Sequence, residues 1–199
     1  MERSFKKEVQ ALRLGAGDTF RGEGILAVTK ALLQSGVAYV GGYQGAPVSH
    51  LLDVLVDAED MMAELGVHLE TCTNEASAAA MLGASINYPL RGAVTWKSIV
   101  GTNVAADALS NLSSPGVMGG AMIILGEDYG EGASVIQERS YAYAMKSSMS
   151  TAAPYSMQPA SASTAGRLAA KFASTAARWP GLAVMMATTW IMEPPDFLA

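Results

Sequence analysis

The chain has 199 residues, enough for a single domain with a sizeable apolar core. Half of the residues are hydrophobic and the net charge is −5, an acidic balance that argues against a nucleic-acid-binding groove. Cys72 is the only cysteine, which excludes a disulfide, a zinc cluster or an iron–sulfur site built from this chain's thiols alone. No apolar run reaches membrane-spanning length and no secretion signal is recognisable, so we expect a cytoplasmic protein that does not enter a membrane.

The first part of the chain predicts a polar arm followed by a helix. Residues 2–14 are typical of an arm or a short helix. Residues 22–24 then open a helix, because apolar residues recur at helical spacing from Ile25 to Leu33, and Gly36 ends it. The Gly-x-Gly pairs of this region do not make a dinucleotide-binding fingerprint, since no strand precedes them.

A short strand, Val37–Val40, is followed by a glycine-rich loop, Gly41–Pro47, which holds three glycines and a proline. Ligands bind at the carboxyl ends of strands in parallel sheets, so this segment is either a plain connection or a ligand loop. Ser49 can cap the helix that follows and that runs to Met61. We expect His50 to be a surface or capping residue. The chain has two histidines, so no histidine-centred metal site is expected.

The central stretch joins an apolar run with strand character, Val67–Cys72, to a helix of small residues, Ala76–Asn87. Asn74 is a good N-cap, and Glu75 lies in the first helical turn, where the macrodipole favours an acid in any case. The small residues let a backbone or a flat ligand come close, although they could equally serve internal packing. We interpret Glu75 as a working carboxylate at the mouth of the sheet. His68, in the strand, is expected to be structural.

Two further strands are predicted downstream. Ala93–Trp96 is one, and Lys97–Asn103 is expected to be a third loop at a strand's carboxyl end. A helix through Leu112 follows. Gly119–Leu125 has the continuous apolar character of a buried parallel strand. The acidic loop after it, Gly126–Gly132, lacks the further oxygen ligands that a metal site needs.

The last third of the chain continues the alternation of helices and strands. We predict a lid or interface stretch, a short strand, a helix and a final strand, at Ser134–Met149, Pro154–Pro159, Ala162–Arg178 and Leu182–Met186. Helix and strand alternate about five times with apolar strands, which predicts an α/β fold: a three-layer αβα arrangement with a mostly parallel sheet. The three strand-end segments should then converge on one edge of that sheet.

Several segments occur in the same order and at similar spacing in one known family. They are Gly42-Tyr43-Gln44-Gly45-Ala46-Pro47, Asn74-Glu75, Lys97, Gly101-Thr102-Asn103-Val104-Ala105-Ala106-Asp107, Gly119-Gly120 and Gln137 to Arg139. On these residues the chain, over roughly Gly22 to Thr189, resembles the pyrimidine-binding domain of the indolepyruvate ferredoxin oxidoreductase alpha subunit. That family belongs to the thiamine-dependent 2-oxoacid:ferredoxin oxidoreductases. Its Tyr-Pro-Gly-Thr-Pro motif differs here, because Ala46 replaces the threonine.

The resemblance implies a thiamine diphosphate pyrimidine-domain fold and oxidative decarboxylation of a 2-oxoacid, such as the aryl pyruvate indolepyruvate, to an acyl-CoA. In the family a glutamate hydrogen-bonds the aminopyrimidine ring nitrogen of thiamine diphosphate and so helps to deprotonate its thiazolium carbon. Matching the motif implies that Glu75 has this catalytic role. The other cofactor-binding residues implied are Gly42, Tyr43, Gln44, Gly45, Ala46 and Pro47 as a wall, with Lys97, Ser98 and Asn103 at the border.

The chain shows neither a diphosphate-binding Gly-Asp-Gly…Asn pattern nor a cysteine cluster. Mg²⁺ and [4Fe-4S] clusters are therefore implied only on regions absent from this chain. We expect an N-terminal arm (1–21), a pyrimidine-binding domain (22–191) and the start of an interdomain linker (192–199), in a fragment that is inactive alone and assembles as an oligomer. The implied partners are a C-terminal diphosphate-binding domain, a beta subunit, ferredoxin, coenzyme A and the 2-oxoacid, with no nucleic acid or membrane.

Two other functions remain open. The same domain could serve a non-oxidative thiamine-dependent decarboxylase or synthase, such as a sulfopyruvate decarboxylase. It could also be a non-catalytic α/β module kept for assembly, and Ala46 in place of threonine gives that reading some weight. Cysteine clusters in the remainder of the reading frame would favour the oxidoreductase over the decarboxylase.

Overall fold

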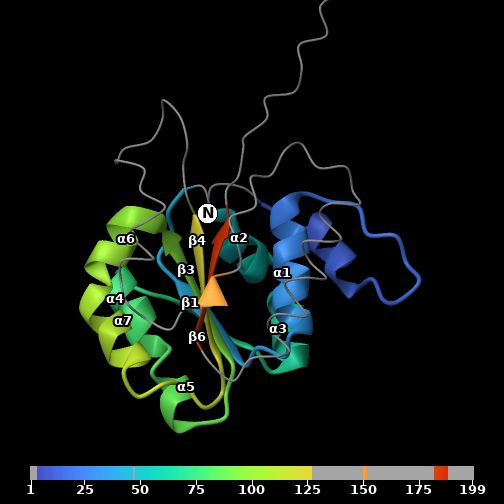
Figure 1. Cartoon of the computed structure of the whole chain (residues 1–199). Helices are drawn as coiled ribbons and strands as arrows, with labels where there is room; N and C mark the ends of the chain where they lie inside the picture. Colours follow the sequence, from blue (N-terminus) through green and yellow to red (C-terminus); the bar gives the residue numbers. More distant parts are fainter. Residues whose placement is uncertain (1–3, 47, 127–149, 152–181, 188–199) are drawn as a thin grey trace, which may run out of the picture.

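The computed structural model describes residues 4–46, 48–126, 150–151 and 182–187, and it shows a parallel sheet with helices on both faces (Figure 1). The strands are β1 (Tyr39–Gly42), β2 (His68–Thr71), β3 (Gly92–Lys97), β4 (Ala121–Gly126), β5 (Ser150–Thr151) and β6 (Leu182–Ala187). Across these residues the sheet has the order β2-β1-β3-β4-β6-β5, and every neighbouring pair is parallel. The predicted three-layer α/β fold is confirmed.

The helices divide between the two faces of the sheet in chain order. One face carries η1 (Glu8–Arg13), α1 (Gly24–Gln34), α2 (His50–Asp57) and α3 (Glu59–Leu65). The other carries α4 (Glu75–Met81), α5 (Ala84–Asn87), α6 (Ser98–Val104) and α7 (Ala106–Ser113). One hydrophobic cluster lies between the sheet and each of the two helical layers. Side chains alternate between the faces of a strand, so the sheet contributes to both clusters.

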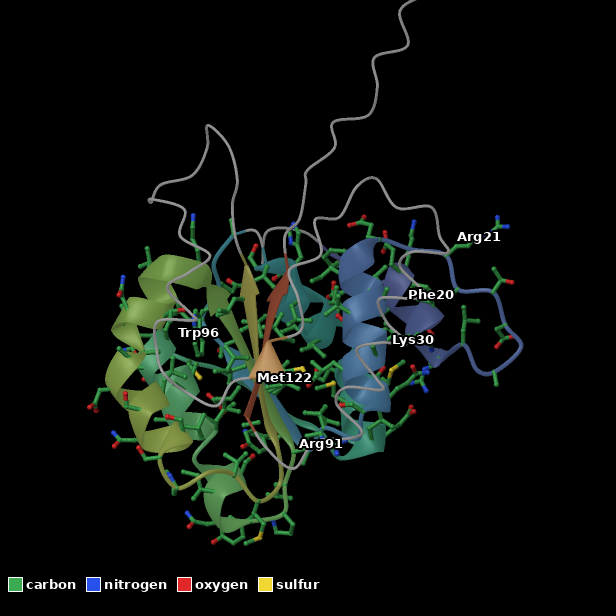
Figure 2. The ribbon with its side chains drawn as sticks, in the orientation of Figure 1. Phe20, Arg21, Lys30, Arg91, Trp96 and Met122 are labelled. Carbon is green, nitrogen blue, oxygen red and sulfur yellow. The ribbon has the colours of Figure 1, made fainter. Side chains whose placement is uncertain are left out.

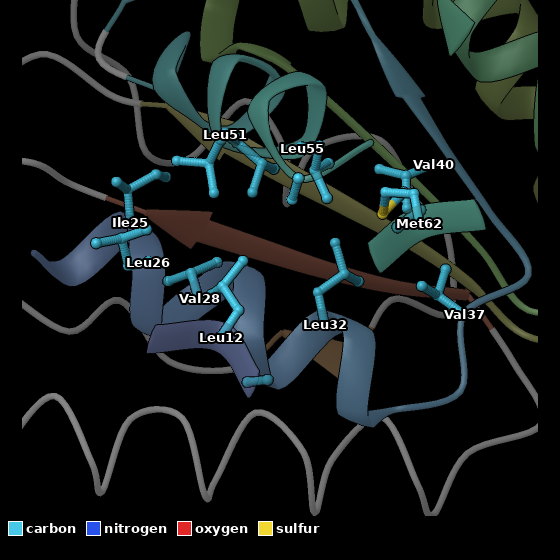
Figure 3. Close-up of a cluster of buried hydrophobic side chains, with 14 of the residues drawn as sticks. Leu12, Ile25, Leu26, Val28, Leu32, Val37, Val40, Leu51, Leu55 and Met62 are labelled. Atoms are coloured by element: carbon cyan, nitrogen blue, oxygen red, sulfur yellow. The ribbon is translucent and has the colours of Figure 1, made fainter. Parts of the chain in front are cut away.

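The first cluster lies between α1, α2 and the sheet. Figure 3 shows Leu51 and Leu55 of α2 pointing toward Val28 and Leu32 of α1. Their apolar spacing follows the helical period, which is why the sequence predicts these two helices. Burial of one such leucine stabilises the fold by about 1.5–3 kcal/mol.

The N-terminal arm is part of this cluster rather than a polar appendage. Phe5 is 0 % exposed and packs in the core with Val9 and Leu12 of η1. The carboxylate of Asp57 accepts hydrogen bonds from the Phe5 backbone N–H and, at 3.1 Å, from the Ser4 hydroxyl. The arm is therefore attached to α2 by both apolar packing and charge-assisted hydrogen bonds.

The second cluster lies between α4, α7 and the sheet. Trp96 of β3 is 0 % exposed and lies on the side of the sheet that α4, α6 and α7 cover (Figure 2). Ala78 and Ala79 of α4 are buried in the same cluster. A Cβ at Gly41 would overlap the Met81 side chain, so glycine lets α4 approach β1 closely. The smooth face of α4 thus serves internal packing.

Several predicted boundaries are wrong. Lys97–Asn103 is not a loop: Lys97 ends β3 and α6 begins at Ser98. The first strand begins at Tyr39 and takes in Gly41 and Gly42, which were expected in the loop. Two of the expected helices are each divided, at Ala58 and between Met81 and Ala84, and the helix expected after Asn103 is α7, which begins at Ala106. His68 is not a buried structural residue, since its side chain is 69 % exposed and lies 3.5 Å from Glu70.

The final predicted strand, Leu182–Met186, is confirmed as β6. The predicted elements Pro154–Pro159 and Ala162–Arg178, the lid stretch before residue 150 and the acidic loop after Gly126 lie outside the described residues. Among the helices that the structure describes, none is long and apolar enough to span a membrane.

Candidate functional site

The carboxyl ends of β2, β1 and β3 lie side by side at one edge of the sheet. Gly42, the last residue of β1, pairs with Thr71 on one side and Thr95 on the other. Beyond the strands, the Tyr43 N–H donates to the Thr95 carbonyl at 3.0 Å and the Cys72 N–H donates to the Gly42 carbonyl at 2.8 Å. The segments that follow these three strands therefore all begin at the same edge of the sheet.

Glu75 is the first residue of α4 and lies at this edge. Asn74 fixes the start of the helix, because its side-chain oxygen accepts the Ser77 N–H at 2.8 Å. The Glu75 side chain is 7 % exposed. Among the described residues it forms no hydrogen bond or ion pair. A buried carboxylate that accepts no hydrogen bond has lost its solvation without compensation, which costs roughly several kcal/mol. We therefore expect the Glu75 side chain to pair with a group outside the described residues.

The Glu75 side chain lies between α4 and α6, next to Trp96. A Cβ added to Gly101 of α6 would lie 2.8 Å from the Glu75 Cγ and would overlap the Trp96 ring. The Trp96 indole N–H donates to the Thr102 hydroxyl at 3.3 Å, which holds the ring beneath α6. Gly101 is thus the position where the absence of a side chain lets Glu75 stay buried.

The glycine loop lies over the end of β3. A Cβ at Gly45 would lie 2.8 Å from the Lys97 Cβ and 3.1 Å from its backbone nitrogen. The Val48 N–H donates to the Gly45 carbonyl at 3.1 Å, which closes the loop before α2. Tyr43 is 42 % exposed, and Gln44 donates from its amide to Asp53 of α2 at 3.1 Å.

The structure thus brings together most of the sequence-predicted site residues at one edge. Gly42 is buried in β1, Gly45 and Lys97 are half-buried against each other, and Tyr43, Gln44 and Ala46 are exposed. Ser98 opens α6, Asn103 lies exposed near its end, and Pro47 is outside the described residues.

Two residues at this edge escaped the sequence reasoning. Gly101 had no individual signal beyond its place in the family-like motif. Asp53 had one: it is the single acid inside an apolar helical run, Leu51 to Leu55, and such an acid requires partners when the helix is buried.

Among the described residues, the titratable group at this edge with a shifted pKa is the half-buried thiol of Cys72. Burial raises the pKa of the Cys72 thiol, a backbone hydrogen bond with Gly42 opposes this, and the Glu70 charge adds to the rise. In the part of the chain that the structure describes, no group of three or more His, Cys, Asp or Glu side chains could hold a metal ion.

Comparison with known proteins identifies relatives of this chain. No protein-family model matches it. Over 102 residues it is 33 % identical to the indolepyruvate oxidoreductase subunit IorA of Thermococcus kodakarensis, covering 51 % of this chain and 15 % of that subunit. The IorA of Pyrococcus abyssi is 27 % identical over 134 residues, covering 67 % of this chain and 20 % of that subunit. The chain is thus similar to IorA subunits over half to two thirds of its length.

The resemblance to the indolepyruvate oxidoreductase alpha subunit that the sequence motifs indicated is thus confirmed by these similarities. The chain spans a fifth or less of the length of these two IorA subunits, 15 % and 20 %. A solved structure shares the fold: the 2-oxoglutarate:ferredoxin oxidoreductase from Magnetococcus marinus, with 2-oxoglutarate, coenzyme A and succinyl-CoA bound. Its TM-score is 0.59 at 12 % identity, over 88 % of this chain and 32 % of that chain.

Proposed function

We propose that this chain is the pyrimidine-binding half of a thiamine diphosphate-dependent 2-oxoacid:ferredoxin oxidoreductase that acts on an aryl pyruvate such as indolepyruvate. The observation that carries the proposal is the carboxylate of Glu75, which is buried at the carboxyl edge of a parallel sheet and has no partner among the residues that the structure describes. The relationship to IorA supports the reaction class and the aryl substrate.

The residues present fit the aminopyrimidine side of the cofactor. A buried carboxylate that lacks a donor is suited to a ring nitrogen that carries a proton, because the hydrogen bond would remove the desolvation cost of both groups. Glutamate is favoured over aspartate here, since one methylene less would stretch the bond by about 1 Å and largely lose it.

When bound, thiamine diphosphate supplies a thiazolium carbon that adds to the keto group of a 2-oxoacid and accepts the electron pair released on decarboxylation. Glu75 would share one proton between its carboxylate oxygen and the ring nitrogen, and would so orient the aminopyrimidine ring. The loop from Gly42 to Pro47 would wall the site and exclude water, with Ala46 presenting a methyl group where the family motif has a hydroxyl. Lys97, Ser98 and Asn103 would border it.

Other parts of the enzyme are proposed to lie outside this chain. They are a C-terminal domain that binds the diphosphate through Mg²⁺, [4Fe-4S] clusters that pass electrons to ferredoxin, and a beta subunit. In this proposal residues 1–21 form an arm, 22–191 the pyrimidine-binding domain and 192–199 the start of a linker. The assembly would be a cytoplasmic oligomer that also binds coenzyme A.

The test is Glu75→Gln in the whole gene product with its partner subunit. The amide keeps the size of the side chain but cannot hold the proton, so we expect 2-oxoacid-dependent ferredoxin reduction to fall about 10²- to 10⁴-fold. The matched control is Glu70→Gln, the same change on an exposed residue of β2 five positions earlier. It should leave the rate unchanged.

A rate for Glu75→Gln equal to that of the control would refute the proposed role of Glu75. Indolepyruvate and 2-oxoglutarate should be compared as substrates in the same assay, and we expect the aryl pyruvate to be preferred. Carbon dioxide release without ferredoxin reduction would instead favour a non-oxidative decarboxylase. Failure of the wild-type protein to bind thiamine diphosphate in calorimetry would favour the assembly module.

A further inference from the structure

A second buried carboxylate lies on the other face of the sheet, in α2. Asp53 is 2 % exposed and lies among the apolar residues of that helix. Each of its oxygens has one partner: Oδ1 accepts from the Gln44 amide at 3.1 Å and Oδ2 contacts the His50 Nδ1 at 3.2 Å. A buried charge is tolerated only when it is paired in this way.

The partner Gln44 belongs to the glycine loop, not to the core. Its side chain is exposed apart from this contact, and the residues around it are Tyr43, Gly45 and Ala46. Backbone hydrogen bonds hold the loop at its two ends, from the Tyr43 N–H to Thr95 and from the Val48 N–H to Gly45. Between them, Gln44 joins the loop to a helix whose position the core fixes.

The other partner completes a connection to the N-terminal arm. The His50 ring lies edge-on to Phe5, with ring centroids 5.5 Å apart. Because Phe5 is 0 % exposed, this contact restrains the imidazole and so restrains the Asp53 carboxylate. Because His50 restrains Oδ2 of Asp53, the other oxygen, Oδ1, faces Gln44 in one fixed direction.

We propose that Asp53 is a positioning residue, which holds the loop of residues 43–46 over the end of β3 through Gln44 and thereby shapes the wall of the cofactor site. The consequence for the cofactor rests on the proposed function above, whereas the tether between Asp53 and Gln44 does not. A glycine-rich loop adopts many conformations, so one hydrogen bond to a fixed charge changes its population strongly.

The decisive pair of variants is Asp53→Leu and Asp53→Asn, measured with Gln44→Ala and the double variant Gln44→Ala/Asp53→Leu. Leucine fills the buried volume but accepts no hydrogen bond, whereas asparagine keeps an oxygen for the Gln44 amide. The control is Asp57→Asn, on the same helix one turn later, where the carboxylate binds Ser4 and Phe5 instead.

Amide hydrogen exchange of residues 43–48 measures the tether in the full chain. Loss of a hydrogen bond to a carboxylate should raise the exchange rates of the Tyr43 and Val48 amides about ten- to a hundredfold in Asp53→Leu and in Gln44→Ala. The double variant should show no further rise, Asp53→Asn a smaller one, and Asp57→Asn none. The melting temperature of each variant is measured as well, so that a rise in exchange confined to the loop is distinguished from a loss of global stability.

The outcomes separate this inference from the proposed function. Unchanged exchange in Asp53→Leu, or an equal rise in Asp57→Asn, would overturn the tether whether or not any cofactor binds. Thiamine diphosphate added to the whole gene product should slow exchange of the same two amides in the wild type. If it binds without slowing them, the loop is not a wall of the site; if it does not bind at all, the proposed function fails while the tether is judged by exchange alone.

Discussion

Gly101 tests the packing on which the buried position of Glu75 depends. It is buried in α6, between Trp96 at 0 % exposure and Glu75 at 7 %. In Gly101→Ala the new methyl group would overlap the Trp96 ring and lie 2.8 Å from the Glu75 Cγ. The Trp96 ring can move little, because it is fully buried and its indole N–H donates to the Thr102 hydroxyl. We therefore expect Gly101→Ala to destabilise the fold and to displace the carboxylate.

Two opposing effects set the magnitude. An extra methyl group in a well-packed core costs about 1–3 kcal/mol. Alanine instead of glycine inside a helix contributes roughly 1 kcal/mol in the other direction. A methyl group that overlaps a fully buried ring should cost about 2–3 kcal/mol, the upper part of that range, so the net loss should be about 1–2 kcal/mol. A domain of this size loses about 2–4 °C in melting temperature for each kcal/mol. Gly101→Ala should therefore melt about 2–8 °C below the wild type.

Thermal unfolding followed by circular dichroism measures this difference. Val104→Ala is the control, since Val104 is on the same helix but 48 % exposed, and its melting temperature should stay close to that of the wild type. A Gly101→Ala protein that melts above the wild type would refute the reasoning. That result is the one helix propensity alone predicts, and it would mean that α6 does not press on Trp96 and Glu75.

The remaining two predictions concern the core and the cysteine. Leu55→Ala should lose about 2–5 kcal/mol in the free energy of unfolding, measured by urea denaturation, because the side chain is 0 % exposed. Leu65 is 55 % exposed, so Leu65→Ala should change the free energy of unfolding little. Equal losses for the two variants would contradict the placement of Leu55 in the core. Burial raises the pKa of the Cys72 thiol, so less thiolate is present at a given pH than in free cysteine. Iodoacetamide should therefore react more slowly with native Cys72 than with free cysteine, and the pH–rate curve should shift to higher pH. Unfolding in urea should abolish the difference. A native rate equal to that of free cysteine would contradict this prediction.

Short-range signals predicted much of the fold correctly. The helical period from Ile25 to Leu33 marks α1, and the apolar run at Gly119–Leu125 marks β4. Asn74 caps α4 as its residue type predicts, with Glu75 in the first turn. These features depend on the residue and its near neighbours, so a single sequence is sufficient to find them.

Long-range packing decided what the sequence reasoning missed. Lys97–Asn103 contains Gly101 and the weak helix formers Thr102 and Asn103, which is typical of a loop, yet residues 98–104 form α6, whose Gly101 packs directly against Trp96. Likewise, Gly41 and Gly42 extend β1 because α4 and β3 leave no space for side chains there. Neither effect can be read from local propensity, because both depend on residues that only the fold brings near.

The sequence by itself therefore determined the α/β class, the starts of the main helices and the placing of an acid where a strand meets a helix. The tertiary structure decided that β2, β1 and β3 are neighbours, that Glu75 is buried with no partner in the described part of the chain, and that Asp53 accepts a hydrogen bond from Gln44. The physical reason is that burial and pairing of a charge depend on which segments the chain brings together in space. Residue type and helical or strand period, by contrast, are local properties of the chain.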